Sequence, residues 1–84
     1  GDNVNAVKGL VVKAVAGRDS GRFFVILGKE DKYCFIADGK SRKLSSPKRK
    51  SIKHLSFTGN VIDLNDITDK KLRKVLGEYS HLTD

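Results

Sequence analysis

The stretch "AGRDSGRFFVILG", residues 16 to 28, decides the fold. In it, two glycines bracket a polar and charged triplet, and the chain then enters an apolar run. A tight hairpin turn needs residues that adopt positive φ angles, which Gly17 and Gly21 supply. The β-branched run "GLVVKAV", residues 9 to 15, precedes the turn. The sequence therefore predicts a β-hairpin with residues 9–15 and 22–28 as its two strands.

Three more short strands are expected after this hairpin. "DKYCFIADG" predicts a third strand from Lys32 to Ala37, after a turn at "GKED". Residues 40–51 are polar, contain the only proline and are expected to form a loop. "SIKHLSF" at 51–57 and "NVIDL" at 60–64 predict the last two strands, separated by a turn at "TGN". Five short strands with tight turns favour a small closed barrel, because closure removes exposed sheet edges.

The C-terminal segment "ITDKKLRKVLGEYSHL" predicts an amphipathic helix from about Asp69 to Leu82. Its apolar residues recur at spacings of three and four, which places them on one face of a helix. Thr68 is the expected N-cap, and Asp69 follows in the first turn, where the helix dipole favours an anion. The apolar face consists of Leu72, Val75, Leu76, Tyr79 and Leu82.

Length and composition indicate one small domain. At 84 residues, the chain is near the lower limit for a single hydrophobic core without disulfides or metal. The only cysteine, Cys34, cannot form an internal disulfide, which favours a reducing compartment. No apolar run approaches the roughly 20 residues that span a bilayer, and no catalytic pair, metal-ligand spacing or cofactor fingerprint occurs. We therefore expect a soluble, cytoplasmic protein, monomeric when free, with no enzymatic activity, cofactor, metal or membrane partner.

Positive charge is concentrated in the middle of the chain. The net charge is +7 and the isoelectric point is about 9.8. Residues 38–54 carry seven Lys and Arg against one acid, whereas the segments on either side are close to neutral. A localised basic segment in a domain of such high isoelectric point is typical of a protein that binds a polyanion. The alternative is that these lysines only keep an exposed loop solvated.

The arginines of the first turn fit the same interpretation. A hairpin tip that projects Arg18 and Arg22 could reach phosphates from the end of a barrel, and Asp19 could orient one of them through a bidentate pair. In the alternative interpretation, an internal pair between Asp19 and an arginine only shapes the turn.

Residues 9 to 28, "GLVVKAVAGRDSGRFFVILG", resemble a KOW motif, in which two strands flank a basic, glycine-containing turn. Together with "IADG" and "RKLSSPKRKSIKHL", their order is similar to the archaeal and eukaryotic large-subunit ribosomal protein family L14e and its short bacterial relatives. The resemblance covers about Gly9 to Leu55. It implies a small SH3-like β-barrel that contacts ribosomal RNA through basic loops, and a role in the ribosome or in translation.

The combined expectation is a mainly β protein: a small SH3-like β-barrel of about five strands at residues 7–64, with one amphipathic α-helix in residues 65–84 packed on or beside it. Its expected function is to bind structured RNA, ribosomal RNA in particular. Recognition by backbone and shape is favoured over base stacking, because most of the six aromatic residues are expected in the core. Ribosomal or transcription proteins are further expected partners. The alternatives are a protein-interaction module of KOW type and a general DNA-binding domain. The candidate RNA-binding residues are Arg18, Arg22, Lys40, Arg42, Lys43, Lys48, Arg49, Lys50, Lys53 and His54.

Overall fold

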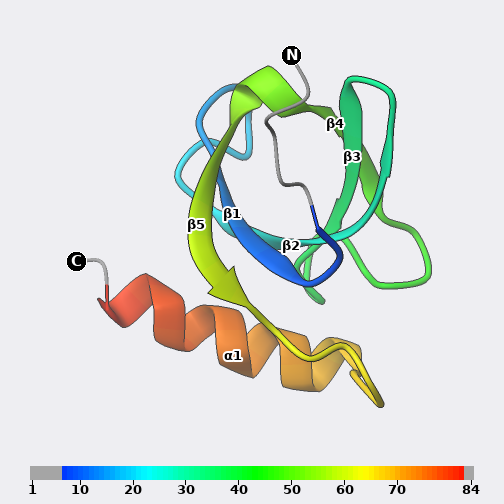
Figure 1. Cartoon of the computed structure of the whole chain (residues 1–84). Coiled ribbons are helices and arrows are strands. Elements are labelled where there is room, and N and C mark those ends of the chain that lie inside the picture. Colours follow the sequence, from blue (N-terminus) through cyan, green and yellow to red (C-terminus); the bar gives the residue numbers. More distant parts are fainter. Residues whose placement is uncertain (1–6, 83–84) are drawn as a thin grey trace.

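The computed structural model describes residues 7–82 as one strongly curved sheet with a helix beneath it (Figure 1). The five strands are antiparallel and lie in the order β4-β3-β2-β1-β5. The predicted fold class, a small SH3-like β-barrel with one C-terminal α-helix, is confirmed. The elements are β1 (Leu10–Ala14), β2 (Phe23–Glu30), β3 (Tyr33–Ala37), β4 (Lys48–Ser51), the short 3-10 helix η1 (Ile52–His54), β5 (Leu55–Val61) and α1 (Asp69–Leu82).

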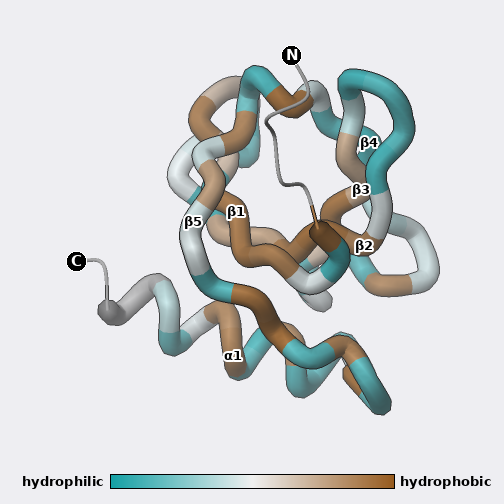
Figure 2. The backbone as a smooth tube through the Cα atoms, in the orientation of Figure 1, coloured by the Kyte–Doolittle hydropathy of each residue, from teal (hydrophilic) through white to brown (hydrophobic). Residues whose placement is uncertain are grey.

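Both faces of the sheet are buried where β1 and β2 run through it. Successive side chains of a strand point to opposite faces, so Val11 and Val12 cannot share one core. Val12 belongs to the cluster inside the barrel with Phe24, whereas Val11 belongs to an outer cluster with Val25 and the helix residue Leu72. All five side chains are fully buried. Figure 2 shows this as hydrophobic stretches along β1 and β2.

Helix α1 forms as its sequence predicts. Thr68 caps it, because its Oγ1 accepts a 3.2 Å hydrogen bond from the amide of Lys71. Leu72 and Leu76 pack against the outer face of the sheet and are 0% and 5% exposed. The side chain of Leu82 and residues 83–84, which end the predicted helical segment, lie outside the described residues. Within residues 7–82, no helix is long and apolar enough to cross a membrane.

The fourth and fifth strands differ from the prediction. Residues 48–51, expected in a loop, form β4, which pairs with β3. Residues 52–54, expected in a strand, form η1. The expected turn at Thr58–Asn60 is wrong, since β5 continues through it and Gly59 is not among the positive-φ glycines. The turn expected at "GKED" also lies later, because β2 extends to Glu30 and Asp31 has the positive φ angle, 54°.

Two connections place the basic residues. The β1–β2 turn and the β3–β4 loop meet at one end of strands β2, β3 and β4, because antiparallel neighbours alternate in direction. The β2–β3 turn and the end of β4 lie at the other end of these strands, where the amide of Ile52 donates a 2.9 Å hydrogen bond to the carbonyl of Lys32. Strand β4 therefore joins two regions that both carry lysine and arginine.

Candidate nucleic-acid interface

The β1–β2 turn has the conformation that its glycines predict. Gly17 and Gly21 have φ angles of 81° and 89°. The amide of Gly21 donates a 2.7 Å hydrogen bond to the carbonyl of Ala14, which closes the turn. Arg18 is exposed here, and its side chain has no hydrogen-bond or ion-pair partner among the side chains of residues 7–79. Arg18 is therefore free to bind an anion.

Asp19 fastens this turn to β4. Its Oδ2 accepts a 2.8 Å hydrogen bond from Nζ of Lys48, whereas Nη1 of Arg22 lies 4.0 Å from its Oδ1. The hydrogen bond from Lys48 is the main cause that holds the pKa of Asp19 below its ordinary value, and the charges of Lys50 and Arg22 act in the same direction against the effect of burial. The bidentate arginine pair suggested by the sequence is thus replaced by a bond to a lysine of another strand.

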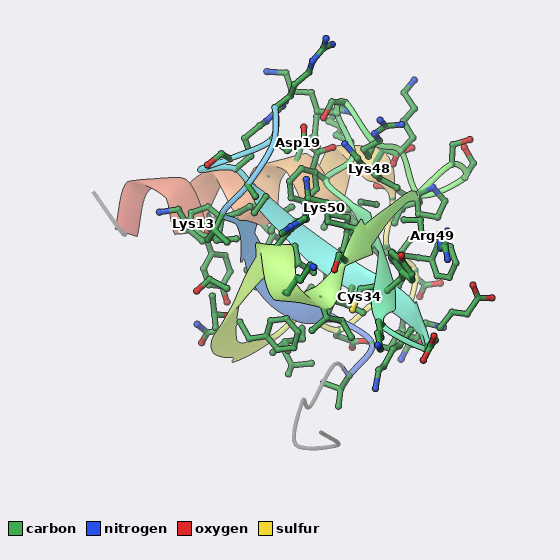
Figure 3. The ribbon with its side chains drawn as sticks, turned by 90° about the horizontal axis from the view of Figure 1, so that it is seen from above. Lys13, Asp19, Cys34, Lys48, Arg49 and Lys50 are labelled. Atoms are coloured by element: carbon green, nitrogen blue, oxygen red, sulfur yellow. The ribbon has the colours of Figure 1, made fainter. Side chains whose placement is uncertain are left out.

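Lys50 is a cation inside the barrel. It lies opposite Cys34, whose side chain is fully buried, so both point to the interior face of the sheet. Lys50 is 8% exposed, and its Nζ donates a 3.0 Å hydrogen bond to the carbonyl of Ala16. Figure 3 shows Lys48 beside Asp19, with Lys50 nearer the middle of the molecule. Lys48 and Lys50 therefore both hold the turn in place, which limits their availability for a partner.

Arg22 is also partly engaged. Its Nη2 lies 3.5 Å from Oδ2 of Asp38, a buried carboxylate at the start of the β3–β4 loop. Oδ1 of Asp38 accepts hydrogen bonds from the amides of Lys40 and Arg42, at 2.9 and 2.8 Å. The side chain of Arg22 is 42% exposed. Its outer edge could contact a phosphate, but its charge is partly neutralised.

The β3–β4 loop has a fixed backbone and free basic side chains. Arg73 of α1 donates a 2.6 Å hydrogen bond to the carbonyl of Gly39, and Asp69 accepts one of 2.8 Å from the amide of Leu44. A Cβ at Gly39 would collide with the backbone of Asp69, so only glycine fits this approach. Three cations of this loop are exposed and have no side-chain partner within residues 7–82: Lys40, Arg42 and Lys43.

A second basic surface is an open groove of about 1060 Å³ between the β2–β3 turn and the segment from β4 to η1. We call it the basic groove. One acid, Asp31, lines it, and the side chains of Lys32, Lys53 and His54 have no partner within the described part of the chain. At the rim, Asp31 has a positive φ angle in the β2–β3 turn, and the Lys32 carbonyl accepts a hydrogen bond from the amide of Ile52. The basic groove is lined by Lys29, Asp31, Lys32, Tyr33, Arg49, Lys50, Ser51, Ile52, Lys53 and His54.

Arg49 stands over an aromatic ring at the wall of this groove. Its guanidinium carbon lies 3.8 Å from the centroid of the Tyr33 ring, and its Nε lies 3.9 Å from Oε1 of Glu30. The side chains of Arg49 and Glu30 are 56% and 67% exposed. An ion pair between two such exposed groups contributes little to stability. The ring therefore does more than the acid to orient Arg49, and the outer side of the guanidinium faces solvent.

The ten predicted residues thus divide between two surfaces and not one stripe. Lys29 and Lys32 also line the basic groove but are not among the residues predicted from the sequence. They lie outside the basic segment 38–54, and only the β2–β3 hairpin brings them to the same rim as Lys53. The turn signal before the third strand, with lysines on both sides of Asp31, is the pattern that could have indicated them. The β1–β2 turn, the β3–β4 loop and the start of β4 carry Arg18, Arg22, Lys40, Arg42, Lys43 and Lys48, and the basic groove is lined by Arg49, Lys50, Lys53 and His54, of which Lys50 also bonds to the turn.

Within residues 7–79, whose side chains the structure describes, no group of three or more His, Cys, Asp or Glu side chains is arranged to hold a metal ion. No family model matches the chain, and no curated protein matches it either. The function is therefore argued from the chemistry of these two surfaces.

Proposed function

We propose that the protein binds RNA, ribosomal RNA in particular, through these two basic surfaces. The observation that carries the proposal is the basic groove, whose lining has four exposed Lys and Arg, the buried Lys50 and one histidine against one acid. Lysines at the rim can neutralise phosphates without giving up an internal partner, since Lys32 and Lys53 have none within residues 7–82. Neutralisation of phosphates supplies most of the affinity of sequence-independent nucleic-acid binding.

The β1–β2 turn supplies a second contact for the same partner. Arg18 projects from a turn that Asp19 and Lys48 hold rigidly against β4, so little side-chain and loop ordering is needed on binding. Lys40 and Lys43 are presented by a loop whose backbone is bonded to α1. Two rigidly spaced basic surfaces favour a partner with a defined shape over a flexible polyanion.

RNA is favoured among polyanions by the likeness of residues 9–55 to KOW proteins. Contacts to phosphates and 2′-hydroxyls along an A-form helix suit lysine-rich loops, which read shape more than sequence. A role in translation, and with it a cytoplasmic location, follows from the same resemblance and belongs to this proposal.

The test is binding to a structured RNA over a range of salt concentrations. Affinity should fall steeply with salt, by roughly 0.7 to 0.9 log units per log unit of salt for each phosphate contact. The double variant Lys32→Gln with Lys53→Gln should lower this slope by about two contacts. Lys70→Gln with Lys74→Gln is the matched control, because it removes the same charge from exposed positions of α1.

Two results would overturn the proposal. If affinity for the RNA is independent of salt, the basic surfaces do not bind phosphate, and a protein-interaction module is the better interpretation. If the groove variant and the helix control lose affinity equally, only net charge matters. Duplex DNA of the same length is the comparison for the third alternative, since equal affinity for both would indicate a general DNA-binding domain.

A further inference from the structure

Two aromatic side chains of β3 lie outside both hydrophobic clusters. Cys34 and Ile36 are fully buried inside the barrel, so Tyr33 and Phe35 point to the outer face of the sheet. Neither belongs to the inner or the outer cluster, and both are partly exposed. The next residue on that face is Ala37, which α1 covers. The helix therefore covers the outer face of β3 only as far as Ala37 and leaves both rings accessible.

The neighbouring strands determine what surrounds these two rings. On the β2 side no side chain covers Phe35, and on the β4 side Arg49 lies against Tyr33. Phe35 lies opposite Gly28 of β2 and Arg49 of β4. Gly28 has no side chain to cover the ring, and a Cβ there would come within 3.9 Å of Phe35. Arg49 leans diagonally across β4 and β3 onto the ring of Tyr33, at 3.8 Å. One planar guanidinium and two rings thus lie on the same face of two neighbouring strands, and we call them the aromatic face.

The aromatic face adjoins the basic groove. Tyr33 and Arg49 line both, and Lys32 and Lys53 lie along the same groove. The charge pattern is that of a single-strand binding site, in which cations track the phosphates and π surfaces stack the bases. Glu30 is an acid beside the aromatic face, since it lies opposite Tyr33 in the β2–β3 pairing and 3.9 Å from Arg49.

We propose that the aromatic face stacks one or two unpaired bases of the bound RNA, while the basic groove holds the adjoining phosphates. The occupant of the aromatic face is thus a single-stranded segment of the structured RNA, such as a loop or an overhang. Arginine planes and aromatic rings are the side chains on which unstacked RNA bases rest. This inference rests on the proposed function and adds to it the form of RNA that is bound.

The experiment compares a single-stranded RNA of about ten nucleotides with a blunt-ended RNA duplex of the same length. Tyr33→Leu removes the ring and keeps an apolar side chain on the sheet, and Tyr33→Phe keeps the ring as the matched control. Tyr33→Leu should weaken single-strand binding by about 5- to 150-fold, the effect of one lost stacking contact. The salt slope should stay unchanged, because no phosphate contact is removed. The affinity of Tyr33→Leu for the duplex should equal that of the parent. Tyr33→Phe should bind both RNAs as tightly as the parent does.

Arg49→Lys is the second variant, and because the side chain of Arg49 is 56% exposed, we expect the fold to stay intact. This change keeps the positive charge and removes the planar guanidinium group. The affinity for the single strand should therefore fall, whereas the salt dependence of that affinity should stay the same. A spectroscopic check uses the two tyrosines of the chain. Base stacking should quench the fluorescence of the parent on addition of the single strand, and Tyr33→Phe, which retains Tyr79, should bind without this quenching.

The outcomes separate the two proposals. If Tyr33→Leu and Arg49→Lys bind the single strand as tightly as the parent while Lys32→Gln with Lys53→Gln binds it less tightly, the stacking proposal is wrong and RNA binding stands. A salt slope lowered by Tyr33→Leu would also overturn stacking. If the parent binds neither RNA at low salt, both proposals are wrong, and an aromatic partner segment of another protein becomes the interpretation of this face.

Discussion

Replacement of Asp19 by asparagine tests the claim that this acid holds the β1–β2 turn. The carboxylate accepts a 2.8 Å hydrogen bond from Lys48 and lies 4.0 Å from Arg22. The charge of Lys50, which is itself buried, also acts on it. Asparagine keeps the shape of the side chain and removes the negative charge on which these three cations act.

The expected cost follows from the exposure of the pair. The side chains of Asp19 and Lys48 are 12% and 28% exposed, so solvent screens their interaction only in part. A hydrogen bond between charged groups contributes about 1.5 to 3 kcal/mol. We expect Asp19→Asn to lower the free energy of unfolding by about 2 kcal/mol, which lowers Tm by about 8 to 16 °C in a domain of this size.

The pH dependence gives an independent check. The folded-state pKa of Asp19 lies below the ordinary value of 3.8. Its contribution to stability is therefore fully present above that value and is lost as the pH falls through the lower, folded-state value. The difference in stability between the parent and Asp19→Asn, measured by urea denaturation, should be constant from about pH 7 to about pH 5 and should shrink below the ordinary pKa.

Asp31→Asn is the control, because it removes the same charge from an exposed side chain and asparagine tolerates the positive φ angle there. It should change stability by less than about 0.5 kcal/mol. A double-mutant cycle with Lys48→Gln should give a coupling energy above about 0.5 kcal/mol. The reasoning is refuted if Asp19→Asn unfolds at the same urea concentration as Asp31→Asn.

Three further predictions concern the helix, the loop and the turn. Leu72→Ala should lower the free energy of unfolding by about 2 to 5 kcal/mol, and an unchanged urea midpoint would show that α1 is not docked. Gly39→Ala should cost at least about 1 kcal/mol more than Gly21→Ala, because a Cβ meets the backbone of α1 only at Gly39; equal thermal stabilities would contradict this. Arg18→Ala should lower the salt slope of RNA binding by about one contact. Arg22→Ala should lower it by less, because Asp38 already neutralises part of the charge of Arg22. Titrations over a salt series measure both slopes, and a larger effect of Arg22→Ala would contradict this.

Local signals explain which elements the sequence could predict. Gly17 and Gly21 need their positive φ angles regardless of the rest of the fold, and Thr68 caps α1 through an amide only three residues away. Strand β4 lacked such a signal. Its composition is polar, yet Lys50 faces the interior and is satisfied by a carbonyl of the β1–β2 turn. That carbonyl comes close to Lys50 only in the folded protein. The polar sequence of residues 48–51 by itself is therefore typical of a loop.

The candidate site was predicted in composition but not in arrangement. Most basic residues of the middle segment lie on the surface, but Lys50 is buried. Asp19 engages Lys48 across 29 positions of sequence, and no local pattern indicates such a bond. The aromatic residues were expected mostly in the core, and Phe23 and Phe24 are there. Tyr33, by contrast, lies on the face of β3 that the helix does not reach, and where α1 docks on the sheet is a tertiary property that no local pattern indicates.

The order of the elements along the chain has a consequence during synthesis. Every strand precedes α1, so the outer face of the sheet is made before the helix that covers it. A nascent chain that has emerged only as far as β5 exposes Val11, Phe23 and Val25. At roughly 5 to 20 residues per second, this state lasts on the order of seconds. During that interval the sheet exposes an aggregation-prone apolar surface to other nascent chains. A chaperone that recognises exposed valine and phenylalanine would bind this surface until α1 docks.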